Sequence, residues 1–177
     1  MDHFYFVRHG QTLWNVENKI CGATDIELTQ LGHEQAIETG HKILEMGIKA
    51  DLIITSPLVR AKETARHISE VTGIPMKVEQ RLIEQNFGVY ESTPRDGAQF
   101  HEAKKHMASR FGTGESMLQM AQRIYNLLDE IKLGDKEYIL VAHNGIVRIV
   151  ESYFRDMDNE EFSSLGIKNC EVKRYDF

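Results

Sequence analysis

The sequence predicts an α/β fold in which a mostly parallel central sheet lies between two layers of helices. Three short apolar runs carry this prediction, because each ends abruptly in polar residues: 4–7, 51–55 and 138–142. Such runs are typical of buried parallel strands. Helical segments alternate with them, the clearest being 117–131, where apolar residues recur at i, i+3, i+4 and i+7. We therefore expect one domain over residues 1–177, built as a three-layer α/β/α sandwich.

Capping signals place the helices between these strands. Thr29 is expected to cap a helix that runs to about Met46, and Ser56 to cap a second with Pro57 at its first position. Ser116 and Gln119 form a capping box for a third helix. The other expected elements are a short strand near 76–79, a helix over about 145–154, and a final strand over about 169–175 whose alternation suits an antiparallel edge.

The segment over about 91–113 is polar and irregular, with one helix expected inside it. We interpret it as a small helical cap inserted over the functional edge of the sheet. Its basic residues Lys104, Lys105 and Arg110 could contact an anionic substrate, but a solvated face is the favoured interpretation.

Composition limits the partners. The 177 residues carry a net charge of −6 and no run of Lys or Arg, which disfavours nucleic acid and anionic membranes. No apolar stretch approaches 18 residues and no signal-peptide pattern is present, so we expect a cytoplasmic protein without a membrane span. Cys21 and Cys170 lack metal-type spacing and are expected to be reduced. The oligomeric state stays open.

Cationic and titratable side chains follow the ends of the three apolar runs. Arg8 and His9 follow the first run, Arg60 the second and His143 the third. In an open parallel sheet these ends share one edge, where ligands bind. Arginine offers a charged fork of donors that suits phosphate, and an uncharged imidazole can attack phosphorus. The pattern predicts a phosphate site with a histidine nucleophile.

The segment Val7-Arg8-His9-Gly10-Gln11-Thr12-Leu13-Trp14-Asn15 resembles the signature of the histidine phosphatase superfamily, also called phosphoglycerate mutase-like. Four further segments resemble family motifs in the family's order: 28–36, 56–65, 82–88 and 141–145. The chain is most similar to the small bacterial-type phosphatase branch. The resemblance implies that His9 becomes phosphorylated, that the Gly10 carbonyl orients it, and that Arg8, Arg60 and His143 clamp the phosphoryl group.

Glu84 is the candidate proton donor to the leaving oxygen. It lies among Leu82, Ile83 and Phe87, an apolar setting that could raise its pKa and suit a general acid. The resemblance favours this role, while Glu91 is the competing residue. The structural alternative is a surface glutamate paired with Arg81.

Neutral residues complete the expected substrate site. Asn15 matches a phosphate-binding position of the family, and Thr12 supplies a further donor in the same loop. Gly22 and Asn144 are expected to shape specificity. Asn144 departs from the commoner His-Gly-Gly pattern, so its side chain is expected to narrow the pocket or touch substrate.

These features predict a histidine acid phosphatase-type phosphomonoesterase that hydrolyses small phosphorylated metabolites through phosphohistidine, with no metal and no cofactor. A phosphoglycerate mutase is the main alternative. Family mutases carry a longer insertion and a C-terminal tail over the site, whereas this chain stops soon after its last strand. A non-catalytic module that senses phosphorylated ligands is a third interpretation.

The remaining histidines receive no joint role. His101 and His106 are five residues apart, which does not place them on one helical face as zinc ligands. His3, His33, His41 and His67 show no ligand spacing and are expected to be solvated or locally bonded.

Overall fold

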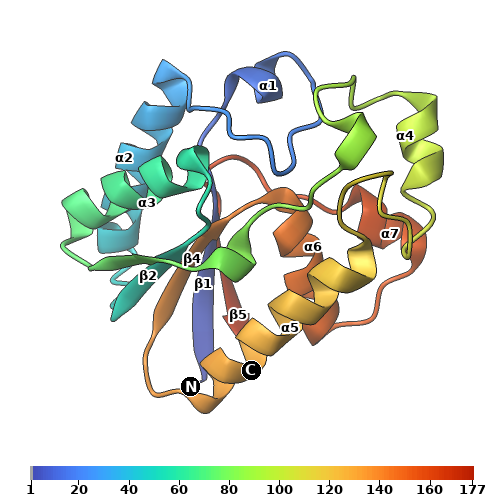
Figure 1. Cartoon of the computed structure of the whole chain (residues 1–177). Coiled ribbons are helices and arrows are strands. Elements are labelled where there is room, and N and C mark those ends of the chain that lie inside the picture. The colour runs from blue at the N-terminus through green and yellow to red at the C-terminus, as the bar shows by residue number, and fades with distance from the viewer. Residues whose placement is uncertain (1) are drawn as a thin grey trace.

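A five-stranded sheet in the order β3-β2-β4-β1-β5 forms the centre of the computed structural model, which describes residues 2–177 (Figure 1). The strands are β1 His3–Arg8, β2 Leu52–Thr55, β3 Met76–Val78, β4 Tyr138–Ala142 and β5 Val172–Asp176. The first four are parallel where they pair, and β5 runs antiparallel to β1. The predicted fold class is confirmed, with the last strand beginning three residues later than expected.

Two helical layers cover the sheet. Helices α2 Gln30–Glu45 and α3 Val59–Thr72 lie on one face, and α5 Met117–Leu133 and α6 Asn144–Phe154 on the other (Figure 1). Alternate side chains of β1 serve the two layers, since Phe4 and Phe6 pack with α5 and α6 while Val7 packs with α2 and α3. Both faces are therefore buried, as a parallel sheet requires.

Two of the predicted caps are confirmed. The Thr29 hydroxyl accepts a hydrogen bond from the Gly32 N–H at 3.1 Å, and the Ser116 hydroxyl accepts one from the Gln119 N–H at 3.2 Å. These bonds satisfy N–H groups that have no partner within their own helices.

The predicted cap at Ser56 is wrong. Helix α3 begins at Val59 after Leu58, and the Ser56 hydroxyl instead bonds to His143 Nε2 at 2.7 Å. Asp25, from a distant loop, accepts the Val59 N–H at 2.7 Å. A tertiary contact has thus replaced a local one, which frees Ser56 for the functional edge of the sheet.

Short elements gather beyond the carboxyl ends of β1 and β4 (Figure 1). They are α1 Leu13–Val16, the 3₁₀ turn Gly88–Tyr90, α4 Ala98–Ala103 and α7 Asn159–Ser164, whereas the 3₁₀ turn Gln80–Leu82 lies beside α5. The expected cap helix is α4, whereas α1 and α7 were not predicted. An apolar cluster of Ile20, Phe87, Phe100 and Phe111 anchors the cap insertion. Within residues 2–177, no helix has the length and apolarity to cross a bilayer.

Candidate active site

The ends of β1 and β4 bring the two proposed histidine motifs together. The His9 N–H donates to the Ala142 carbonyl at 3.0 Å, and the His9 and His143 ring centroids lie 5.2 Å apart. A cleft opens beside them. Its lining residues are Arg8, His9, Asn15, Ile20, Cys21, Glu84, Phe87, Arg95, Phe100, Lys104, Asn144, Gly145 and Arg148.

His9 is held in one tautomer. Its Nδ1 lies 2.7 Å from the Gly10 carbonyl oxygen, so Nδ1 carries the hydrogen and Nε2 keeps its lone pair. Burial, followed by the charges of Arg60 and Arg8, lowers the pKa of His9 well below its usual range. The imidazole is therefore neutral near pH 7. Position 10 must be glycine here, because a Cβ would lie 2.4 Å from the Gly32 carbonyl oxygen.

Arg60 is fully buried behind the loop that follows Ile20. Its Nη1 donates to the Thr24 carbonyl at 2.9 Å and its Nη2 to the Gly22 carbonyl at 2.7 Å. These two bonds fix the plane of the guanidinium. Its Nε has no partner.

Arg8, at the end of β1, is likewise bonded through a terminal nitrogen to a backbone carbonyl. Its Nη1 donates to the Ile167 carbonyl at 2.7 Å, while its buried Nε has no partner. Burial lowers the pKa of Arg8 to about 10, with a smaller contribution from Arg95, so the side chain stays charged at neutral pH.

His143, next to the His9 ring, also has a side-chain nitrogen without a partner. Its Nε2 lies 2.7 Å from the Ser56 hydroxyl, and its buried Nδ1 has no partner. Burial and then Arg60 lower the pKa of His143 well below its usual range, so the ring is neutral. The Ser56 oxygen accepts the Leu58 N–H and can donate its own hydrogen to Nε2. In that tautomer His143 presents an Nδ1–H donor rather than a charge.

Three buried side-chain nitrogens therefore lack partners: Arg8 Nε, Arg60 Nε and His143 Nδ1. They are the full set of buried side-chain nitrogen and oxygen atoms without a partner in residues 2–177. Leaving such a group unsatisfied costs about 1–3 kcal/mol, and more when it is charged. Arg8 and Arg60 act electrostatically on His9, and the His143 ring lies beside that of His9 at an interplanar angle of 56°. The arrangement suits an anion that accepts all three hydrogen bonds.

Glu84 is buried and lines the cleft. Its Oε2 accepts the Gly145 N–H and its Oε1 the Gln85 N–H, both at 2.9 Å. Glycine is needed at 145, since a Cβ there would lie 2.2 Å from Oε1. The surface alternative is excluded, because Arg81 pairs with Glu79 and Glu130 instead.

Glu91, the other candidate for the proton donor, instead stabilises a loop. Its carboxylate accepts the N–H groups of Gly22, Ala23 and Phe87 at 3.0–3.1 Å and the Thr24 hydroxyl at 2.8 Å. It thereby holds the loop whose carbonyls orient Arg60.

The four expected substrate-binding residues divide into two pairs. Asn15 and Asn144 line the cleft, and Asn144 Oδ1 also accepts the Ile167 N–H at 3.1 Å. Thr12 is fully buried and caps α1 by accepting the Asn15 N–H at 3.2 Å. Gly22 presents its carbonyl to Arg60. Thr12 and Gly22 thus lie behind the cleft and position residues that line it.

Sequence reasoning missed two lining arginines and misjudged one lysine. Arg95 and Arg148 line the cleft, and Arg148 projects from α6 five residues after His143. Lys104 was expected to be solvated, yet it lines the cleft and donates to the Ser163 carbonyl at 3.2 Å. Burial lowers the pKa of Lys104 to about 8. Lys105 and Arg110 are exposed, as expected.

Asn169 was also missed. Its Nδ2 donates to the His9 carbonyl at 2.8 Å and lies 3.3 Å from Asn15 Oδ1. The spacing of 160 residues from His9 leaves no local signal for this contact.

Comparison with known proteins agrees with the arrangement of the cleft. A family model described as the histidine phosphatase superfamily (branch 1) matches residues 4–177. The chain belongs to the histidine phosphatase superfamily. The resemblance of its five motifs to this family is thereby confirmed.

Relatives within the superfamily include phosphatases and proteins named as mutases. A probable phosphoglycerate mutase of Erwinia tasmaniensis is 33% identical over 97% of this chain and 83% of its own length. A mycobacterial glucosyl-3-phosphoglycerate phosphatase, solved with VO₃, is 26% identical with a TM-score of 0.84, covering 98% of this chain and 90% of that one. "Mycobacterial hydrolase 1" also has a TM-score of 0.84, at 25% identity and the same coverage. Membership and these relatives support a phosphatase or a mutase.

The protonation state of His9 provides a direct test of the cleft's electrostatics. Because burial and the two arginines lower its pKa, we expect the ring to stay neutral as the pH falls through 6.5 and to become protonated only well below that value. An NMR titration of the imidazole signals in the free protein, with His9→Ala for assignment, measures this. A midpoint at or above 6.5 would contradict the described environment.

Proposed function

We propose that the protein is a phosphomonoester hydrolase that acts on small phosphorylated metabolites through a phosphohistidine at His9. The observation that carries the proposal is that the three unpartnered nitrogens belong to Arg8, Arg60 and His143, which all lie near the neutral ring of His9. A phosphoryl group has oxygens to accept all three bonds. Catalysis of its transfer depends mainly on positioning and on stabilising negative charge.

In the first step, His9 Nε2 attacks phosphorus and forms an N–P bond while the ester P–O bond breaks. Glu84, in its protonated form, gives its proton to the departing alkoxide oxygen. In the second step, Glu84 as a carboxylate takes a proton from water, the water oxygen bonds to phosphorus, and the N–P bond breaks to release phosphate. The two guanidiniums supply the positive charge in both steps, so the proposal includes no metal and no cofactor.

The cations around the cleft favour substrates with a second anionic group. Arg95, Lys104 and Arg148 line it in addition to Arg8. Burial lowers the pKa of Lys104 and of Arg148, and a bound anion would stabilise their charged forms. We therefore propose a phosphorylated acid as substrate. The name of the mycobacterial relative, a glucosyl-3-phosphoglycerate phosphatase, is consistent with this class.

Phosphoryl transfer to a second hydroxyl is the alternative, because curated relatives 33% identical to the chain are named probable phosphoglycerate mutases. Hydrolysis is preferred since the cap beside the cleft consists of one six-residue helix and its loops. A mutase must keep water from its phosphohistidine, whereas a hydrolase must admit it.

Phosphate release from a panel of phosphomonoesters in EDTA tests the reaction. We expect wild-type release that falls to background in His9→Ala. We also expect a higher kcat/KM for 3-phosphoglycerate than for glycerol 3-phosphate, which lacks the carboxylate. Conversion of 3- to 2-phosphoglycerate without release would instead support the mutase. Binding without any turnover would support a phospholigand-sensing module.

Substitution of Glu84 tests its role as proton donor. A good leaving group needs no proton, so Glu84→Gln is expected to lower kcat/KM about 10²–10⁴-fold for an alkyl phosphate and far less for p-nitrophenyl phosphate. Glu91→Gln is the matched control. It is expected to lower thermal stability, because its carboxylate bonds to the loop, without changing the ratio between the two substrates. Equal losses on both substrates in Glu84→Gln would remove the proposed role.

A further inference from the structure

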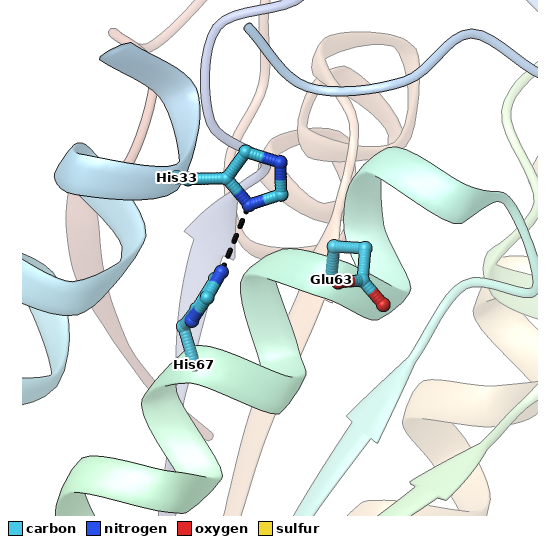
Figure 2. Close-up of side chains that lie close together, drawn as sticks. All are labelled: His33, Glu63 and His67. Carbon is cyan, nitrogen blue, oxygen red and sulfur yellow. Dashed lines mark hydrogen bonds between the residues drawn. The ribbon is translucent and has the colours of Figure 1, made fainter. Parts of the chain in front are cut away.

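A second cluster of titratable side chains lies outside the cleft, between α2 and α3. His33 projects from α2, and Glu63 and His67 project from one face of α3, four residues apart (Figure 2). His33 Nδ1 and His67 Nε2 are 2.9 Å apart. One ligand atom from each of the three residues lies within 4.8 Å of the others.

We propose that His33, Glu63 and His67 form a binding site for a late first-row divalent metal, with Zn²⁺ as the preferred ion. Two imidazole nitrogens and a carboxylate are ligands that Zn²⁺ takes in tetrahedral sites, with a water in the fourth position. Zn–N bonds of about 2.0–2.1 Å at a tetrahedral angle place two ligand nitrogens about 3.3 Å apart. The two nitrogens therefore need to separate by about half an ångström, and the rings must also turn so that both lone pairs point at the ion.

The outer nitrogen of His67 already has a suitable neighbour. Glu70 Oε2 lies 3.7 Å from His67 Nδ1, on the side away from His33. A carboxylate in this position commonly orients a metal-binding histidine and selects the tautomer that leaves the inner nitrogen free. In the free protein one of the two rings donates its hydrogen to the other. On metal binding that hydrogen moves to the outer nitrogen of its own ring, so no net proton is lost.

In the free protein, the Arg66 guanidinium contacts two of the three proposed metal ligands, Glu63 and His67. Its guanidinium bonds to Glu63 Oε2 at 2.8 Å, and its Nη2 lies 3.3 Å from His67 Nε2. It also bonds to Glu70 at 2.6 Å, which would retain it after it leaves Glu63. Because a guanidinium can only donate, His67 Nε2 carries the lone pair that a metal would take. A divalent ion would therefore take the place of the partly exposed Arg66 guanidinium as the positive charge beside Glu63 and His67.

A metal here would link α2 and α3 behind the segment that follows His9. Gly32, next to His33, is packed against Gly10, and the Thr64 hydroxyl, next to Glu63, accepts the Gly10 N–H at 3.0 Å. We expect the bound metal to raise thermal stability by holding α2 against α3. It has no part in the proposed hydrolysis.

Zn²⁺ titration of the full chain, freed of metal by chelation, tests the site by competition with a chromophoric chelator. Wild type is expected to bind one equivalent and to show a higher Tm with Zn²⁺, and Co²⁺ to give a tetrahedral absorption spectrum. His33→Ala and His67→Ala should each weaken binding by at least about 100-fold. Arg66→Gln should strengthen it, since Glu63 is released.

Two controls separate this site from other histidines. His41→Ala removes an exposed histidine of the same helix, and His9→Ala removes a possible ligand in the cleft. Both are expected to bind Zn²⁺ as wild type does, and circular dichroism checks that every variant is folded. Failure of wild type to bind one equivalent, or unchanged binding in folded His33→Ala and His67→Ala, would overturn the proposal. Phosphate release in EDTA is scored separately, so neither proposal depends on the other.

Discussion

Arg60 is fully buried, and its guanidinium donates to two backbone carbonyls rather than to a carboxylate. Removing a charge from water without an opposite charge is expensive, so the surrounding backbone must be held firmly enough to compensate. Glu91 provides that rigidity, because its carboxylate bonds to backbone or hydroxyl groups of Gly22, Ala23 and Thr24. Arg8 has the same requirement and meets it through the Ile167 carbonyl.

The buried arginines affect the protonation of both histidines in the site. Burial, and then the positive charge of Arg60, lower the pKa values of His9 and His143 and keep both rings neutral, which leaves the lone pair on His9 and the hydrogen on His143 that the proposed reaction requires. Each arginine is fixed by its terminal nitrogens and leaves Nε without a partner. In the free protein, hydrogen-bond donors therefore remain without acceptors at the proposed phosphoryl site. Such preorganisation stabilises charge without reorganisation during the reaction.

Much of the fold and of the cleft was predictable from sequence, because the signals are local. Apolar runs identified the strands, and strand ends share one edge, so Arg8, His9 and His143 were expected to meet there. Ser56 shows where local rules fail, since its hydroxyl bonds to His143 rather than capping α3.

Tertiary packing explains why the sequence did not predict several other residues of the cleft and of the histidine cluster. Arg95 and Lys104 reach the cleft only because the cap insertion folds over it on Phe100 and Phe111. His33 and His67 meet across two helices, 34 residues apart, so spacing within one helix could not pair them. Glu84 and Glu91 are both acidic residues of one segment, and their different bonding partners distinguish them.

The proposed binding site for a phosphoryl group rests on the three unpartnered nitrogens. A crystal structure of the protein with vanadate tests it most directly. We expect vanadium bonded to His9 Nε2, with its oxygens within hydrogen-bond distance of Arg8 Nε, Arg60 Nε and His143 Nδ1. Vanadate bound elsewhere, or those nitrogens bonded to other protein groups while vanadate is absent from the cleft, would contradict it.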